Sequence, residues 1–170
     1  MLNIRNVEAD DLPALIAIEN LCFSKDEAAT KEAFIKRILF IKDTFYVAEE
    51  HGEVLGFING PVISVPFITD DLFTEIMENP KLGGHQSILG LAVSPNHQKR
   101  GIATILLEFM EKKAREKERE TITLTCKEDL IPFYEKRGLS NQGKSSSQHG
   151  GVTWFNMTKK IYSQNKYKKL

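Results

Sequence analysis

Apolar and polar residues alternate, or recur at helical spacing, along the first 59 residues. Leu2 to Val7 alternates as a strand does, whereas the apolar positions of residues 12–21 lie on one face of a helix that begins with two acidic residues. A second helix is predicted over residues 30–41. The segment 44–59, with a His-Gly dipeptide at its centre, is predicted to form a hairpin. The N-terminal part therefore contributes three strands and two helices.

The middle of the chain combines a buried strand with the most regular helical pattern. Ile88 to Val93 is a continuous apolar run, which is typical of a strand covered on both faces. After a polar loop, five apolar residues between 102 and 110 lie on one face of a helix, and residues 121–126 alternate again as a strand. Short connections between these elements predict a parallel crossover within residues 86–126, inside a largely antiparallel sheet.

Shorter elements complete a single domain. Residues 70–77 and 129–136 are predicted to form short helices, and two more strands are expected around the Gly/Ser-rich loop at 143–151. A chain of 170 residues with 41% hydrophobic side chains has the size of one globular domain. We therefore expect one domain over residues 1–162, followed by a basic, solvated tail at 163–170.

The charge balance argues against a nucleic-acid partner or a membrane-bound protein. Lysine plus arginine and aspartate plus glutamate both number 23, so the formal net charge is zero. The N-terminus carries no apolar signal run, and no stretch approaches the roughly 20 apolar residues of a membrane-spanning helix. We expect a cytoplasmic protein, monomeric or homodimeric, without a nucleic-acid or membrane partner.

Cysteines and histidines show the spacing of neither a metal site nor a disulfide framework. Cys22 and Cys126 lie far apart in the sequence, which favours a reducing compartment and two free thiols. The four histidines are scattered and lack the paired spacing of metal ligands. No bound metal is therefore expected.

A phosphate-binding turn is predicted where the buried strand leads into the long helix. Backbone N–H groups at a helix N-terminus have no partners within the helix, and the helix dipole adds positive charge there. Gly101 and Ala103 would let a phosphate approach these amides closely, while Lys99 and Arg100 add charge at the rim. The glycine patterns of dinucleotide folds and of nucleotide loops are both missing, so the pyrophosphate of another ligand is favoured.

Several segments carry a resemblance to a known superfamily. Residues 91–95 (Leu-Ala-Val-Ser-Pro) and 98–103 (Gln-Lys-Arg-Gly-Ile-Ala) resemble the acetyl-CoA motif of the Gcn5-related N-acetyltransferase (GNAT) superfamily. The run 126–138 resembles its arylalkylamine (serotonin-type) branch more closely. Further similar segments are 18–23, 56–60 and 152–157. The resemblance implies an α/β (α+β) GNAT-type fold, with a mixed, mostly antiparallel sheet of six to seven strands, a central parallel β-α-β crossover and about four helices.

The resemblance also implies acetyl-CoA as acetyl donor and an amine as acceptor. The backbone amides of residues 99–104 would hold the pyrophosphate. The cofactor-binding residues that it implies are Leu91, Ala92, Val93, Gln98, Lys99, Arg100, Gly101, Ile102, Ala103, Thr104 and Phe133. A backbone N–H at Leu91, freed by a bulge near Gly90, would face the developing charge on the thioester oxygen. Tyr134 would act as the general acid toward the departing thiolate.

The general base is the least defined part of this mechanism. A primary amine has a pKa near 10, so about one molecule in a thousand is uncharged at neutral pH. The arylalkylamine branch places two histidines at positions where this chain has Ser87 and Leu89. Ser87 with ordered water is the favoured route for the proton, and His85 is the alternative if the start of the strand curls toward the site.

Two other functions remain open at this point. One is an acyl-CoA-binding regulatory domain without turnover, which the missing histidine pair would explain. The other is a protein acetyltransferase that acts on lysines or N-termini, because fold and cofactor site do not determine the acceptor. An apolar pocket for an aromatic amine would favour a small acceptor. The phenylalanines that could line such a pocket are Phe23, Phe57, Phe67 and Phe73.

Overall fold

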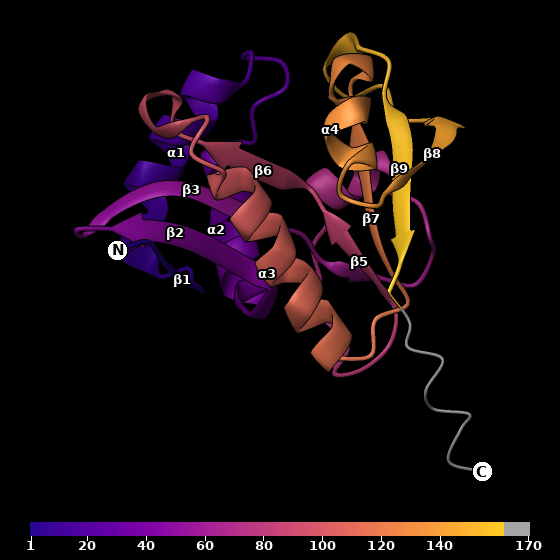
Figure 1. Cartoon of the computed structure of the whole chain (residues 1–170), viewed down its shortest axis with the longest axis horizontal. Coiled ribbons are helices and arrows are strands. Elements are labelled where there is room, and N and C mark those ends of the chain that lie inside the picture. Colours follow the sequence, from indigo (N-terminus) through magenta and orange to yellow (C-terminus); the bar gives the residue numbers. More distant parts are fainter. Residues whose placement is uncertain (162–170) are drawn as a thin grey trace.

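The computed structural model describes residues 1–161, in which four helices accompany nine strands in two sheets (Figure 1). The helices are α1 (Leu12–Cys22), α2 (Lys31–Phe40), α3 (Ile102–Glu116) and α4 (Ile131–Glu135). The strands are β1 (Asn3–Asn6), β2 (Phe45–Glu50), β3 (Glu53–Asn59), β4 (Val62–Ile63), β5 (His85–Ile88), β6 (Gly90–Val93), β7 (Thr121–Cys126), β8 (Ser140–Lys144) and β9 (Phe155–Lys160). The first sheet has the order β1-β2-β3-β6 and the second β4-β5-β7-β9-β8.

The first sheet is antiparallel and is covered on both faces. Because successive strand residues point to opposite faces, Tyr46 and Ile58 pack with α3, while Phe45 and Phe57 pack with α1 and α2. The rings of Phe34, Phe45 and Phe57 form a cluster with centroids 5.6–6.4 Å apart. This core holds the first sheet and its helices as one layered unit (Figure 1).

The second sheet contains the predicted parallel crossover. Strand β5 pairs in parallel with β7, whereas its other neighbour β4 and the remaining pairs of the sheet are antiparallel. The chain passes from β5 through β6 and α3 to β7, so the long helix lies between the two parallel strands in sequence. This arrangement confirms the predicted fold class and its β-α-β unit.

The apolar run at residues 88–93 does not form one strand. It divides at Leu89 into β5, which belongs to the second sheet, and β6, which belongs to the first, and the two sheets diverge from this point (Figure 1). Leu89 N–H donates to Asn59 O at 2.8 Å, although Asn59 is the register partner of Gly90. Two residues of one strand thus face one residue of the other, which is a β-bulge. The bulge explains the division that apolarity alone could not predict.

Two other expectations differ in extent from the structure, and a third lies outside the described residues. The helix predicted at 70–77 is a single 3-10 turn at Asp70–Phe73. Strands number nine in two sheets within residues 1–161, because the central strand divides and β4 is only two residues long. The whole predicted tail at 163–170, together with its expected boundary at residue 162, lies outside the described residues.

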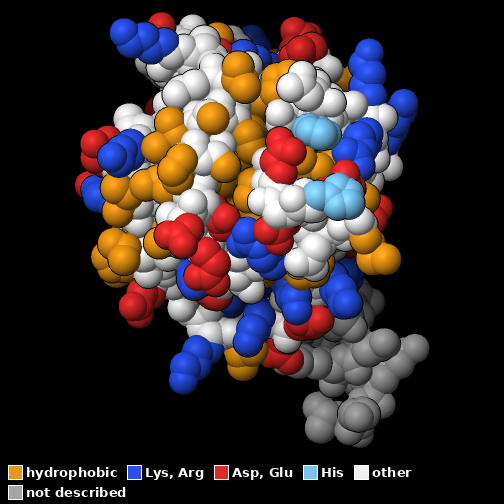
Figure 2. Space-filling model, turned by 90° about the vertical axis from the view of Figure 1, so that its left-hand side faces the viewer, with side chains coloured by type: hydrophobic (Ala, Val, Ile, Leu, Met, Phe, Trp, Pro, Cys, Tyr) orange, Lys and Arg blue, Asp and Glu red, His pale blue; other side chains and the backbone are white. Residues whose placement is uncertain are grey.

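The surface at the β1 side of the molecule carries intermixed acidic and basic side chains (Figure 2). None of the helices within residues 1–161 has the length and apolar character that a membrane span requires.

Both cysteines are free, and Cys126 is buried.

Candidate active site

Two cavities open on either side of the point where β5 and β6 diverge. One, here called the donor groove, has a volume of about 480 Å³ and is lined by β6, the start of α3 and α4. The other, here called the acceptor pocket, has a volume of about 110 Å³ and lies beside α1, β5 and β7. Leu91, Leu130 and Tyr134 line both cavities. A group bound in the groove can therefore meet a molecule in the pocket at these three residues.

The donor groove contains the predicted phosphate-binding turn. Lys99 and Gly101 both adopt left-handed backbone conformations, with φ of 65° and 78°, and Gly101 is the N-cap of α3. A Cβ added to Gly101 would have no neighbour within 4 Å, so the space before the turn is open. The amides of the first turn of α3 thus face an unobstructed cavity, which fits a pyrophosphate.

The side chains next to this turn stabilise its conformation and add little charge to the groove. Gln98 Nε2 donates to Val93 O at 3.0 Å and ties the loop to β6. Arg100 forms a two-bond ion pair with Glu50 at 3.0 and 3.2 Å, so its charge is directed to the β2–β3 hairpin. Unlike Lys99, Arg100 does not line the groove. The predicted contribution of Arg100 to the rim is therefore weakened by Glu50.

Arg137 is a donor-groove residue for which the sequence predicted no role. Its guanidinium donates from Nε to Thr104 Oγ1 at 2.9 Å and from Nη1 to Phe133 O at 2.6 Å, and it lies 3.5 Å from the Phe133 ring centroid. Phe133 in turn packs edge-on against Tyr134, with centroids 5.0 Å apart. This stack fixes the wall of the groove beside the tyrosine.

Tyr134 is positioned to act where groove and pocket meet. Its side chain is buried, and the described residues provide no hydrogen-bond partner for its hydroxyl. Burial, followed by the nearby Cys126, raises the pKa of the phenol above its usual value, so the proton stays bound at neutral pH. Burial also raises the pKa of the Cys126 thiol, to about 11, which argues against Cys126 as a nucleophile.

The register of β6 leaves the Leu91 amide facing away from β3. Ser94 N–H donates to Leu55 O at 2.7 Å, so hydrogen-bonded pairs alternate from there along β3 and β6. Leu91 pairs with Ile58 at a non-hydrogen-bonded position of this ladder. Its N–H therefore points toward the gap between the sheets, as the predicted oxyanion donor would.

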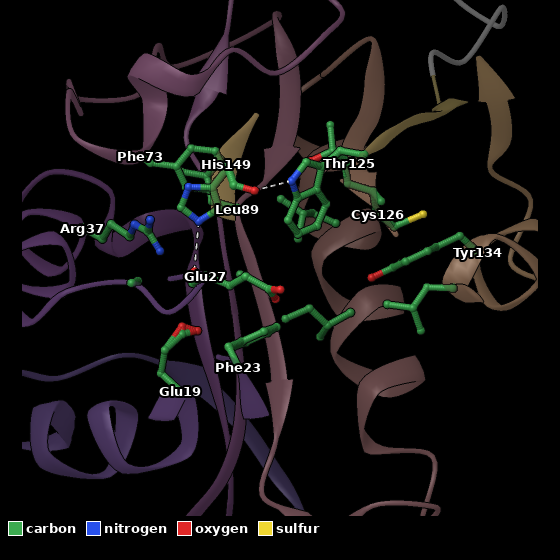
Figure 3. A pocket seen from close by; sticks show the side chains of 17 residues that line it. Glu19, Phe23, Glu27, Arg37, Phe73, Leu89, Thr125, Cys126, Tyr134 and His149 are labelled. Atoms are coloured by element: carbon green, nitrogen blue, oxygen red, sulfur yellow. Dashed lines mark hydrogen bonds between the residues drawn. The ribbon is translucent and has the colours of Figure 1, made fainter. Parts of the chain in front are cut away.

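The acceptor pocket brings together charged residues from distant segments (Figure 3). Glu19 of α1 and Arg37 of α2 lie on one side, and Glu27 projects between them and Tyr134. Burial raises the pKa of Glu19 to about 7, against the opposing effects of Arg37 and of the Ala29 amide. Glu27 forms an ion pair with Lys127 at 2.7 Å. The pocket therefore combines a carboxyl group that titrates near neutrality with a paired carboxylate.

Aromatic rings form the outer wall of the pocket. Phe73 and His149 stack with an interplanar angle of 2° and centroids 4.4 Å apart, and Trp154 lies at 6.2 Å from the same imidazole. Hydrogen bonds hold this wall in place: His149 Nε2 with Glu27 O at 3.0 Å and Trp154 Nε1 with His149 O at 2.7 Å (Figure 3). Of the four predicted phenylalanines, Phe23 and Phe73 line the pocket.

The other two phenylalanines lie elsewhere. Phe57 belongs to the core between the first sheet and α2, and Phe67 is 40% exposed without lining the pocket.

The structure does not bring either predicted base to the pocket. Ser87 is fully buried, and its hydroxyl donates to Pro61 O at 2.5 Å. His85 lies at the start of β5, where Nδ1 contacts Thr121 Oγ1 at 2.9 Å and Nε2 contacts the Glu120 carboxylate at 2.9 Å. The strand start does not curl toward the site, because β5 is in register with β7 from its first residue. Neither residue lines the pocket, so Glu19 replaces them as the candidate base.

Glu19 and Arg37 were overlooked, although the sequence carries a signal for both. Each is a charged residue on the apolar face of its helix, at i+4 from Leu15 and i+3 from Phe34. All four side chains are buried. A charge on the buried face of a helix is unusual and marks a candidate functional residue.

The chain matches the model of a known protein family. The model of the acetyltransferase (GNAT) family matches residues 12–139. The structure is similar to the GphF GNAT-like decarboxylase in complex with isobutyryl-CoA, with a TM-score of 0.81 and 18% identity over 94% of this chain and 99% of that one.

Two solved acetyltransferases are similar as well. The ribosomal-protein-S18-alanine N-acetyltransferase from Escherichia coli has a TM-score of 0.70 and 18% identity, covering 96% of each chain. The PaiA N-acetyltransferase from Thermoplasma acidophilum, in complex with coenzyme A, has a TM-score of 0.68 and 19% identity over 94% of this chain and 99% of that one. At these identities the likeness establishes the fold.

Proposed function

The chain belongs to the acetyltransferase (GNAT) family, and we propose that it transfers the acetyl group of acetyl-CoA directly to a primary amine held in the acceptor pocket. The observation that carries this proposal is the meeting of donor groove and acceptor pocket at Leu91, Leu130 and Tyr134. A thioester in the groove and an amine in the pocket then share one reaction point in a ternary complex.

The donor side would be held by backbone atoms. The amides at the start of α3 bind the pyrophosphate, and the Leu91 N–H faces the thioester oxygen as negative charge develops there. The side chain of Phe133, with Arg137 stacked on it, shapes the groove next to the reacting group. Acetyl-CoA supplies the acetyl group.

Two proton transfers complete the reaction. As its nitrogen forms a bond to the acetyl carbon, the amine loses a proton that water carries to Glu19, because Glu19 lies on the side of the pocket opposite Tyr134 (Figure 3). A group with a pKa of about 7 suits this task at neutral pH. As the carbon–sulfur bond breaks, the Tyr134 hydroxyl donates its proton or a strong hydrogen bond to the leaving thiolate.

Aromatic walls support a small amine with a ring or an apolar chain, in line with an arylalkylamine-like acceptor. Phe23, Phe73 and Trp154 offer flat apolar surfaces against which such a ring or chain can pack. A pocket of about 110 Å³ suits a small molecule better than a folded protein surface.

The test is release of CoA thiol from acetyl-CoA in the presence of tryptamine, phenethylamine, polyamines, aminoglycosides and peptides. We expect turnover with small amines and little with peptides. Stoichiometric CoA binding without thiol release over the whole panel would instead support a regulatory acyl-CoA-binding domain. Turnover restricted to peptides would support a protein acetyltransferase.

A further inference from the structure

Arg37 faces the acceptor pocket with most of its hydrogen-bonding capacity unused. The side chain is 1% exposed and lines the pocket. Among residues 1–161, its guanidinium makes one hydrogen bond, from Nη1 to Asn59 Oδ1 at 3.3 Å, and its Nε is buried without a partner. An arginine carries five N–H donors, and buried polar groups are normally satisfied. The guanidinium can thus donate hydrogen bonds to the acceptor atoms of a ligand.

The positive charge of Arg37 also lacks a close counter-charge. Burial lowers its pKa to about 10, so the guanidinium is still protonated at neutral pH. Glu19 attracts it electrostatically, yet no carboxylate of the described residues lies within 4.0 Å of it. Glu27, the other acid of the pocket, is already paired with Lys127. The neighbouring Asn59 Nδ2 is likewise buried without a partner.

A buried charge without a partner destabilises a fold unless a ligand completes the site. The group that matches a guanidinium in charge and geometry is a carboxylate, which can accept two parallel N–H bonds. Asn59 Nδ2 would offer one more donor at the same place. Arg37, which lines the acceptor pocket, therefore gives one end of it a preference for an anionic group.

Arg37 and Tyr134 lie on opposite sides of the pocket, with Glu27 between them (Figure 3). Since Tyr134 marks the reacting end, a carboxylate at Arg37 must be remote from the reacting amine. We propose that the acceptor is an amino acid whose carboxylate binds Arg37 and whose acetylated amine lies at the far end of a ring or chain. This inference rests on the proposed function and specifies its substrate class.

Matched acceptors test the proposal. We compare 4-(2-aminoethyl)benzoate with phenethylamine and 6-aminohexanoate with pentylamine, so that each pair differs only in the carboxylate. The wild-type protein should show kcat/KM about 10- to 100-fold higher for the acid of a pair, as expected for hydrogen bonds to a charged group. Values within twofold for both pairs would overturn the proposal.

The preference should depend on Arg37 alone. In Arg37→Met the ratio of kcat/KM for the acid to kcat/KM for the amine should fall to about one. This ratio is the readout, because Arg37 also lowers the pKa of Glu19 and so affects the turnover of both acceptors. Folding of this variant is expected, because an apolar side chain of similar size in place of an unpaired buried charge is often neutral or stabilising. Lys36→Met is the matched control, since Lys36 is the exposed neighbour on α2 and donates only to Thr74 O. A preference that persists in Arg37→Met would contradict the assignment.

A binding measurement on the wild-type protein separates this inference from the proposed function. 4-Ethylbenzoate should bind in the presence of CoA, and the uncharged 4-ethylbenzamide should bind at least about tenfold more weakly, as calorimetry can measure. If no amine of the panel is acetylated, the proposed function fails, while this comparison still decides whether Arg37 binds carboxylates. Equal affinities for the two compounds would overturn the carboxylate site. Turnover of amines without preference would overturn the inference alone.

Discussion

The donor groove and the acceptor pocket share three residues yet are built in opposite ways. The groove draws on two continuous segments, residues 91–104 and 130–137, and its proposed ligand contacts are largely backbone amides. The pocket combines two short runs, residues 88–91 and 124–126, with single side chains from α1, α2, α4, three 3-10 turns and the loops between them. A backbone site is specified by local conformation, whereas a side-chain site depends on how distant elements pack. The two halves of the site should therefore respond differently to substitution.

The largest effect is expected at the turn of the donor groove. Gly101→Glu places a side chain and a negative charge in the open space before α3. Losing two charge-assisted hydrogen bonds of about 1.5 kcal/mol each would weaken acetyl-CoA binding about 100-fold or more, as calorimetry can measure.

Gly52→Glu is the matched control for this variant. Gly52 has φ of 77° and open space around its Cβ position, as Gly101 does, but it lies in the β2–β3 hairpin. Both variants should lose about 1–2 kcal/mol of folding stability from the left-handed conformation. Only Gly101→Glu should lose affinity, and unchanged binding in that variant would remove the pyrophosphate from this turn.

The donor groove could be predicted from the sequence because its residues are contiguous, whereas the acceptor pocket could not. The family match confirms the superfamily resemblance, which rested on contiguous motifs such as 98–103; the arylalkylamine branch stays a prediction. The acceptor pocket needed tertiary structure, because nothing local distinguishes Phe23 and Phe73 from Phe57 in the core. The division at Leu89 was missed for the same reason, since it depends on pairing with Asn59.

The general base is the point at which local reasoning and the geometry of the pocket differ most. Ser87 is a candidate because Ser87 and Leu89 stand where the arylalkylamine branch has histidines, and His85 because it lies two residues earlier. The pocket, by contrast, is lined by residues from Ile88 onward and by α1. A buried glutamate on an apolar helix face was the available signal, and its pKa is raised by burial, which only the folded structure shows.

The next largest effect is expected at Tyr134. Tyr134→Phe should lower kcat about 100-fold while changing acetyl-CoA affinity less than about threefold, because the ring still fills its place and only the acidic proton is lost. Tyr46→Phe serves as the control: its hydroxyl donates to Asp43 O at 2.8 Å, and the residue lines neither donor groove nor acceptor pocket. Equal turnover of wild type and Tyr134→Phe would exclude the phenol from the mechanism.

Glu19 should produce a smaller and pH-dependent effect. In the wild type, kcat/KM should rise with pH and level off above about 7, and Glu19→Gln should remove this inflection and lower the rate about tenfold at pH 8. Arg37 is present in both proteins, so its charge does not produce the difference. Glu32→Gln, an exposed acid of α2, should leave the profile unchanged. A wild-type inflection retained in Glu19→Gln would show that another group is the base.

The pH dependence of folding stability tests the pKa of Glu19 independently of catalysis. The folded-state pKa of Glu19, about 7, lies above its ordinary value of 4.5, so the folded state binds the proton more tightly. The free energy of unfolding should therefore fall as pH rises from 4.5 to 7, by up to about 3 kcal/mol. Glu19→Gln lacks this fall, so urea denaturation should show it gaining on the wild type between pH 4.5 and 8. A constant difference between the two would contradict the assigned pKa.

The smallest effect is expected from His85→Ala. The imidazole is held by Thr121 and Glu120 at the far end of β5 and does not line the acceptor pocket, so kcat/KM should change less than about twofold and its pH profile should keep the wild-type inflection. Folding stability should fall by about 1 kcal/mol, because two polar contacts are lost. Comparing His85→Ala with Glu19→Gln distinguishes the two candidate bases. An inflection of the pH profile that is lost in His85→Ala and kept in Glu19→Gln would identify His85 as the base and show that β5 rearranges when substrates bind.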